Sequence, residues 1–190
     1  MKTTALLKLD SAVQLELLIR DIPHRICASL TWLKTMSGDW AMPPDPEWKD
    51  KDRDKFHIYC VGRSIDEGRK IAMRWLIEFV GVSKNKNNLP DRPYRKASDV
   101  WIEHINCGKL FDLQDPNAEI LADVWQGCTQ ASAHSTRDTS HPLVGETELA
   151  EALQIVIDHL EKHLYIPNGF ILREIVCDQE DRKQFKLPAP

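Results

Sequence analysis

The sequence lacks the features that define several large classes of protein. No apolar run approaches the roughly 18 residues needed to span a bilayer. Near the start, the longest uncharged run is the five residues from Thr3 to Leu7, which is too short for the apolar part of a signal peptide. The five cysteines include no CxxC pair. We therefore expect a reduced, cytoplasmic protein without a disulfide framework and outside the membrane.

Glycine is scarce as well, with 8 residues in 190. The sequence contains no phosphate-binding glycine loop, no dinucleotide fingerprint, no HExxH zinc motif and no GxSxG nucleophile elbow. These absences exclude the common nucleotide-dependent enzymes, and we expect no cofactor. The net charge of -4 excludes nucleic-acid binding by the whole surface, although it permits a local basic patch.

The composition is that of a globular protein, with 42% hydrophobic and 28% charged residues. A chain of 190 residues has the length of one ordinary domain. We expect a single helical domain over residues 1–177 and a flexible C-terminal tail over residues 178–190.

Apolar residues recur at helical spacing through most of the chain. Asp10 is a good N-cap for the first helix, within which Pro23 predicts a kink or a division into two helices. Ser64 and Glu67 form a capping box that predicts the start of a central helix ending at Gly81. The expected helices cover residues 11–36, 64–81, 98–107, 115–134 and 147–166.

The segments between these helices are of two kinds. Residues 39–54 are rich in proline and charge, and residues 83–97 in asparagine, proline and basic side chains, which predicts two long surface loops. Residues 56–61 and 170–176 are apolar enough for short strands, although either could instead extend a neighbouring helix. The sequence therefore predicts an all-α fold, a single-domain up-and-down bundle of about five helices.

Three stretches of sequence carry a resemblance to a known family. The central helix opens with Arg63-Ser64-Ile65-Asp66-Glu67, a later helix runs into Ala131-Ser132-Ala133-His134-Ser135-Thr136, and the final helix ends with Leu164-Tyr165. In this layout, residues 10–166 resemble the HEPN helical domains of prokaryotic defence and toxin–antitoxin systems. The resemblance implies a dimeric, metal-independent RNase whose signature is an arginine, four to six residues, and a histidine, with a polar residue directly after the arginine.

The match to that signature is incomplete. His134 fits the histidine and Gln130 the polar position, but Thr129 occupies the position of the arginine. Threonine cannot stabilise an anionic phosphorane as a guanidinium does. We therefore expect a HEPN-like homodimer that binds a protein partner or RNA without efficient catalysis. The alternative is an RNase in which His134 moves the proton and Arg137 supplies the missing positive charge.

The second polar segment carries a group of candidate nucleic-acid ligands. Cations can hold a phosphate backbone, and an aromatic ring among them can stack on a base. The candidates are Lys84, Lys86, Arg92, Tyr94, Arg95 and Lys96.

The tryptophans and one cysteine divide by their surroundings in the sequence. Trp40 and Trp48 lie in the first polar segment, where a large apolar side chain suits a protein interface. Trp75 and Trp125 fall on apolar stripes and are expected in the core. Cys128 is expected there too, as a small apolar residue rather than a nucleophile.

A further alternative rests on two histidines of the last helix. His159 and His163 are four residues apart, a spacing at which two imidazoles can share one metal ion. Further ligands would come from Cys128, His134, His141 or Glu161, none of which has a diagnostic spacing. This alternative is a metal-dependent hydrolase.

Overall fold

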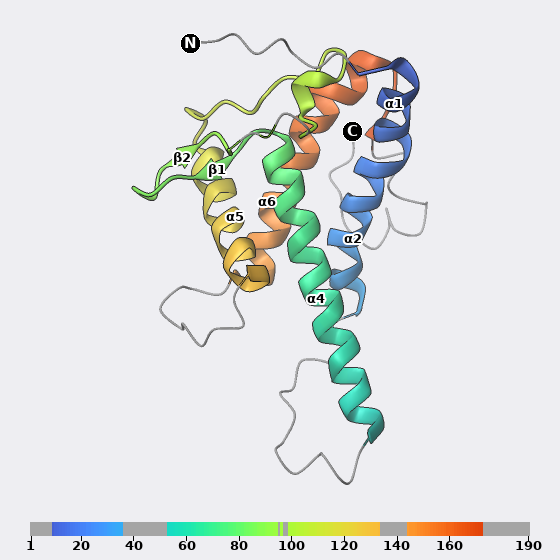
Figure 1. The fold of residues 1–190 in the computed structure, drawn as a ribbon, viewed down its shortest axis with the longest axis vertical. Helices are drawn as coiled ribbons and strands as arrows, with labels where there is room; N and C mark the ends of the chain where they lie inside the picture. The colour runs from blue at the N-terminus through green and yellow to red at the C-terminus, as the bar shows by residue number, and fades with distance from the viewer. Residues whose placement is uncertain (1–8, 36–52, 95, 97–98, 134–143, 173–190) are drawn as a thin grey trace.

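A computed structural model describes residues 9–35, 53–94, 96, 99–133 and 144–172, with the backbone alone for 30–35, 53–63 and 130–133. The predicted all-α fold is confirmed, since helices make up most of the chain (Figure 1). They are α1 (Ser11–Glu16), α2 (Ile22–Thr35), α4 (Arg53–Phe79), α5 (Asn117–Ala133) and α6 (Glu146–Leu160). The predicted tail over residues 178–190 lies outside the described residues.

The long helix α4 runs through the middle of the molecule (Figure 1). It packs mainly against α2 on one side and α5 on the other, with a smaller contact to α6. Met73, Leu76 and Ile77 are almost fully buried along its C-terminal half, as is Val80 directly after it. The central position predicted for this helix is confirmed.

The N-terminal boundary predicted for this helix is wrong. Helix α4 begins at Arg53, so Ser64 lies inside the helix, exposed. Of the two alternatives for residues 56–61, a strand or an extension of the neighbouring helix, the helical one is observed. Adding residues to an existing helix costs little free energy, and no proline interrupts residues 53–79. The strand suggested near 170–176 is absent over 170–172, and Leu172 is helical. Residues 173–176 lie outside the described part of the chain.

The second predicted loop instead contains a small antiparallel hairpin. Strand β1 (Ser83–Lys84) pairs with β2 (Pro90–Asp91), so that Ser83 faces Asp91 and Lys84 faces Pro90. The helix predicted over residues 98–107 is reduced to the short 3-10 turn η3 (Ile102–His104). Its length is limited because Trp101 before the turn and Ile105 after it are both extended.

Pro23 has the predicted effect of interrupting the first helix. A π-helical turn, η1 (Leu17–Asp21), separates α1 from α2, and within it the Ile22 amide donates to the Leu17 carbonyl. The next donor in that pattern would be the amide of Pro23, which proline lacks. The carbonyl of Leu18 accepts instead from the hydroxyl of Tyr165 at 2.8 Å.

Tyr165 belongs to a second π-helical turn, η4 (Glu161–Tyr165), which extends α6 and leads into the 3-10 turn η5 (Ile166–Asn168). The Tyr165 side chain is fully buried, and this burial raises the pKa of its hydroxyl. The chain then leaves the helix at Gly169, whose φ of 81° is the left-handed conformation expected after Pro167 and Asn168. No helix in the described part of the chain combines the length and the hydropathy needed to cross a membrane.

Candidate functional site

An open groove of about 810 Å³ lies where the C-terminal half of α4 meets the hairpin and residues 91–94, 96 and 99–101. Helix α5 contributes one further side chain to its lining. The groove combines charged groups with aromatic rings, which come from Trp75, Phe79, Tyr94, Trp101 and Trp125. Aromatic surface and charge together are the usual composition of a site for an amphipathic ligand such as a nucleotide.

Two of these tryptophans were predicted in the core, and that prediction is only partly right. Trp75 and Trp125 are half-buried and line the groove while also packing on the core. Trp75 stacks on Phe79 with ring centroids 4.9 Å apart and an interplanar angle of 9°. The guanidinium of Arg25 lies 4.2 Å from the Trp75 ring centroid, a cation–π arrangement that holds the indole in place.

A network of three side chains connects α4 and α5 in this groove. The carboxylate oxygen Oε1 of Glu78 accepts from Nε of Arg74 at 2.9 Å and from Nε1 of Trp125 at 2.8 Å. Arg74 and Glu78 are one helical turn apart on α4, and the guanidinium of Arg74 also lies 5.7 Å from the centroid of the Trp125 ring. The network fixes the Trp125 ring and places a carboxylate among the aromatic walls.

Local sequence explains how the hairpin is placed beside this network. Gly81 ends α4 with a φ of 91°, and a side chain there would come within 2.6 Å of Leu110. The turn between the strands is organised by Asn85, whose side-chain oxygen accepts from the amides of Asn87 and Leu89. Asn88 adopts a φ of 60° in this turn, a conformation that asparagine tolerates better than most residues.

The cations of the groove are held in different ways. Nζ of Lys84 lies 2.5 Å from the carboxylate of Asp123 on α5, and Nη1 of Arg92 donates to the carbonyl of Gly81 at 2.7 Å. Lys96 and Tyr94 lie at the exposed side of the groove, and Tyr94 is 88% exposed. Four cations and three carboxylates line the groove, which is a locally positive balance in a chain whose net charge is -4.

Four of the six residues predicted to contact nucleic acid come together in this groove, namely Lys84, Arg92, Tyr94 and Lys96. Lys86 is exposed in the hairpin turn and is not among the lining residues. Arg95 lies outside the described residues. The arrangement gathers the predicted ligands on one surface, while their binding of nucleic acid stays a prediction.

The other predicted site residues fall outside the described part of the chain: His134, Arg137, Trp40 and Trp48. Thr129, which the resemblance noted in the sequence aligns with the signature arginine, lies within the described residues. Its hydroxyl donates to the carbonyl of Trp125 at 2.8 Å, one turn earlier in α5. That bond is a local helical contact and supplies no positive charge.

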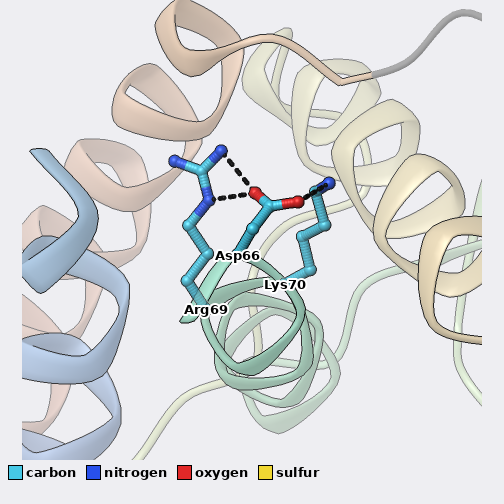
Figure 2. A network of polar contacts seen from close by, with 3 residues as sticks. All are labelled: Asp66, Arg69 and Lys70. Atoms are coloured by element: carbon cyan, nitrogen blue, oxygen red, sulfur yellow. Dashed lines mark hydrogen bonds and ion pairs between the residues drawn. The ribbon is translucent and has the colours of Figure 1, made fainter. Parts of the chain in front are cut away.

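A second group of charges lies in the interior, on the side of α4 that faces α5 and α6 (Figure 2). Oδ1 of Asp66 accepts from Nε and Nη2 of Arg69 at 2.9 and 2.8 Å, and Oδ2 lies 2.6 Å from Nζ of Lys70. Asp66 and Arg69 are 8% and 6% exposed. A buried ion pair with this geometry satisfies its own hydrogen bonds, so removing one partner would leave an uncompensated charge.

The interior around this cluster does not offer a binding site. The void beside Arg69 is about 10 Å³, which holds about one water molecule. Cys128 is fully buried nearby, and burial raises the pKa of its thiol to about 12. The prediction of Cys128 as a core residue is confirmed, and a thiol with so high a pKa is a poor nucleophile at neutral pH.

The two histidines predicted as metal ligands lie side by side, with ring centroids 4.8 Å apart. Nε2 of His159 donates to the carbonyl of Lys109 at 2.7 Å, and its ring packs against Phe111. Burial lowers the pKa of His159 to about 4 and also lowers the pKa of His163. Because Nε2 carries the donated proton, only Nδ1 of His159 could bind a metal without breaking this bond.

No cluster of three or more histidine, cysteine, aspartate or glutamate side chains suited to a metal ion occurs among the residues that the structure describes. Two of the additional ligands considered from the sequence, His134 and His141, lie outside those residues. Within the described part, His159 of α6 packs against the segment around Lys109, and His163 of η4 lies beside it.

Sequence reasoning missed the side of the groove formed by α4 and α5. Arg74 and Glu78 were not singled out, although a charged pair four residues apart beside Trp75 was a usable signal. The partner on α5, Trp125, is 47 residues from Glu78, and no sequence pattern connects the two.

Comparison with known proteins adds nothing to this geometry. No protein-family model matches the chain, and neither the curated proteins nor the solved structures include a significant match.

Proposed function

We propose that this protein is a HEPN-like helical protein that binds single-stranded RNA in the groove between α4, α5 and the hairpin, without cleaving it efficiently. A groove lined by aromatic rings and cations suits a strand whose bases are unpaired, because each base offers a face for stacking and each nucleotide a phosphate for a cation.

The observation that carries this proposal is the position of Tyr94. A tyrosine that is 88% exposed contributes little to the stability of the fold, since its ring remains in water. It lies at a groove also lined by Lys96 and Arg92. A base stacked on Tyr94 would therefore have its phosphate within the range of these cations.

The absence of efficient cleavage is inferred from the position of Thr129. In the family that the sequence resembles, an arginine at this position neutralises the charge that develops on phosphorus. Thr129 bears no charge, and its hydroxyl is bonded to the helix backbone. Binding would then persist where catalysis is lost.

Binding can be tested with a fluorescently labelled RNA of about 12 nucleotides, a length in the range of known single-strand sites. Tyr94→Ala is expected to weaken binding by roughly 5-fold or more, since stacking contributes about 1–3 kcal/mol per base. Lys96→Ala should also reduce the dependence of affinity on salt, by about 0.7 in the logarithmic slope. Fluorescence anisotropy measures both quantities.

Lys162→Ala is the matched control, because Lys162 is an exposed lysine of η4 that does not line the groove. If it weakened binding as much as Lys96→Ala, the interaction would be a general charge effect. RNA that failed to bind the unmodified protein would refute the proposal. A duplex RNA of the same sequence is expected to bind more weakly, because its bases are not available for stacking.

Cleavage is tested on the same RNA, with and without EDTA. We expect intact RNA in both conditions. Cleavage that persists in EDTA and is lost in His134→Ala would instead identify a metal-independent RNase, with Arg137 as the candidate cation. Cleavage abolished by EDTA would favour the metal-dependent alternative based on His159 and His163.

The resemblance also gives the proposal its cellular setting. We propose a cytoplasmic homodimer acting within a prokaryotic defence or toxin–antitoxin system. Light scattering during size-exclusion chromatography tests the dimer. A monomer that binds RNA would be consistent with RNA binding in the groove but would contradict the proposed homodimer.

A further inference from the structure

We infer that Glu78 makes the groove selective for base identity, so that it prefers guanine and disfavours uracil. This inference rests on the proposed RNA-binding function and concerns the same groove. It is carried by the way in which the Glu78 carboxylate is already engaged.

The two hydrogen bonds that Glu78 accepts both end on one oxygen atom. Nε of Arg74 and Nε1 of Trp125 donate to Oε1 at 2.9 and 2.8 Å, and neither bond uses Oε2. Each carboxylate oxygen has two lone pairs, so the acceptor capacity of Oε1 is filled. The capacity that remains on this carboxylate for a ligand is that of Oε2.

Glu78 is also within reach of a ligand. Its side chain is 31% exposed and lines the groove together with the half-buried indoles of Trp75 and Trp125. The contacts with Arg74 and Trp125 restrict its rotamer. The carboxylate is therefore a preorganised acceptor, and it loses little conformational entropy when a ligand binds.

A carboxylate oxygen accepts hydrogen bonds and donates none, so it distinguishes bases by the donors on their edges. Guanine presents two adjacent donors, its N1–H and its exocyclic amino group, which match the two lone pairs of one oxygen. Cytosine and adenine each present one amino group beside an acceptor nitrogen. Uracil presents a single N–H between two carbonyl oxygens, which the negative charge of the carboxylate would repel.

The order of affinity that follows is guanine first, adenine and cytosine next, and uracil last. A well-formed contact to a base edge discriminates by about 1–3 kcal/mol, which corresponds to roughly 5- to 150-fold. Stacking on Tyr94 is available to every base and does not produce this order.

The test uses uridine oligonucleotides of about 12 nucleotides in which one central uridine is replaced by guanosine, adenosine or cytidine. The unmodified protein is expected to bind the guanosine-containing strand at least about 5-fold more tightly than the all-uridine strand. Competition between these strands, followed by anisotropy, gives the ratio directly.

The decisive variant is Glu78→Gln, which keeps the shape of the side chain. Its amide oxygen can still accept from Arg74 and Trp125, so that the amide nitrogen takes the place of Oε2 and converts an acceptor into donors. The guanosine preference should disappear and uridine should become the better ligand. Because the variant also removes a negative charge, all strands can bind more tightly, and the ratio is therefore the measured quantity. Glu151→Gln, at an exposed glutamate of α6, is the control and should leave the ratio unchanged.

The results separate this inference from the proposed function. Equal affinity of the unmodified protein for all four strands would overturn the role of Glu78 while leaving RNA binding established. A guanosine preference that survives in Glu78→Gln would overturn it as well. If none of the strands bound, the proposed function itself would fail.

Discussion

At the scale of single residues, the polar groups of the interior have specific partners. Asp66 is paired with Arg69 and Lys70, and the hydroxyl of Tyr165 donates to a backbone carbonyl. His159 likewise donates to the carbonyl of Lys109. A buried polar group left without a partner would cost about 1–3 kcal/mol of stability. Protonating a buried group also costs stability when its partner or its surroundings favour the neutral form.

His159 should therefore make the stability of the fold depend on pH. Burial lowers the pKa of this imidazole to about 4, against about 6.5 in an unfolded chain. As the pH falls, the unfolded state takes up the proton first. The contribution of the neutral His159 imidazole to stability is therefore complete above pH 6.5 and is lost as the pH falls towards 4. Over this range the free energy of unfolding should decrease by on the order of 2 kcal/mol.

Urea denaturation of the protein and of His159→Gln over this pH range checks the expectation. Glutamine can still donate to the Lys109 carbonyl but does not titrate, so the variant should lose less stability between pH 6.5 and 4. His24→Gln changes an exposed histidine of α2 and is the control. Parallel pH profiles for the protein and His159→Gln would contradict the predicted linkage.

Single-residue burial was predictable where one helix face determines it. Leu149, Leu153, Val156, Leu160 and Leu164 recur at helical spacing within the helix predicted over residues 147–166, and all are buried. Trp75 and Trp125 show the limit of this reasoning. Helical spacing says which face a side chain occupies, but the extent of its exposure depends on what packs there.

At the scale of elements, the junction of α1 and α2 shows how a local sequence feature is completed from a distance. Pro23 and the π-helical turn before it leave the Leu18 carbonyl without a helical donor, and Tyr165, 147 residues further along the chain, supplies one. Pro23 thus creates the need for a hydrogen-bond donor to this carbonyl, and the Tyr165 hydroxyl provides it.

Tyr165→Phe should destabilise the protein by about 1–3 kcal/mol, because it leaves that buried carbonyl without a partner. Pro23→Ala restores a backbone amide near the same carbonyl. Tyr165→Phe should therefore cost less in the Pro23→Ala background, by at least about 0.5 kcal/mol. Chemical denaturation of the two single variants and the double variant completes the cycle.

Tyr94→Phe removes the hydroxyl of an exposed tyrosine and should leave the stability unchanged. An equal cost of Tyr165→Phe in both backgrounds would show that the hydroxyl does not replace the amide that proline lacks.

Element boundaries were predictable where a cap is local. Asp10 accepts from the amide of Ala12 at 2.8 Å, and Asp115 accepts from the amide of Asn117 at 2.9 Å, as their positions before the helices predict. Gly81 and Gly169 end their helices in the left-handed conformation. Ser64 failed as a signal because a capping sequence does not prevent a helix that began upstream from continuing through it.

At the scale of the whole molecule, the lining of the groove is positive although the chain as a whole is negative. The chain has a net charge of -4, yet the lining of the groove has an excess of cations. Asp123 lies beside this lining and neutralises Lys84. The side chain of Asp123 is 58% exposed, whereas that of Lys84 is 14% exposed and lines the groove.

Asp123→Asn should strengthen RNA binding by roughly 2- to 5-fold at low salt, because the positive charge of Lys84 is then no longer neutralised and can interact with a phosphate of the strand. The gain should shrink as salt increases, since screening weakens both interactions. Asp112→Asn removes the same charge from another exposed position. An equal gain in that variant would assign the effect to net charge rather than to Lys84.

The candidate site was predictable only in part, because part of it is assembled by packing between helices. The basic residues of the groove lie within a short stretch, and their clustering is visible in the sequence. Arg74, Glu78 and Trp125 join them only because α4 and α5 pack side by side, which depends on the fold of the whole chain.

The hydrogen bond between Tyr165 and Leu18 also bears on the order of events during folding. The two residues are 147 positions apart, so a ribosome releases the first helices long before the donor that completes them. Until the last helix docks, water must occupy the carbonyl of Leu18. Helices α1 and α2 therefore complete their hydrogen bonding only after Tyr165 has been synthesised and η4 has docked, and their slowest-exchanging amides should become protected together with those of α6.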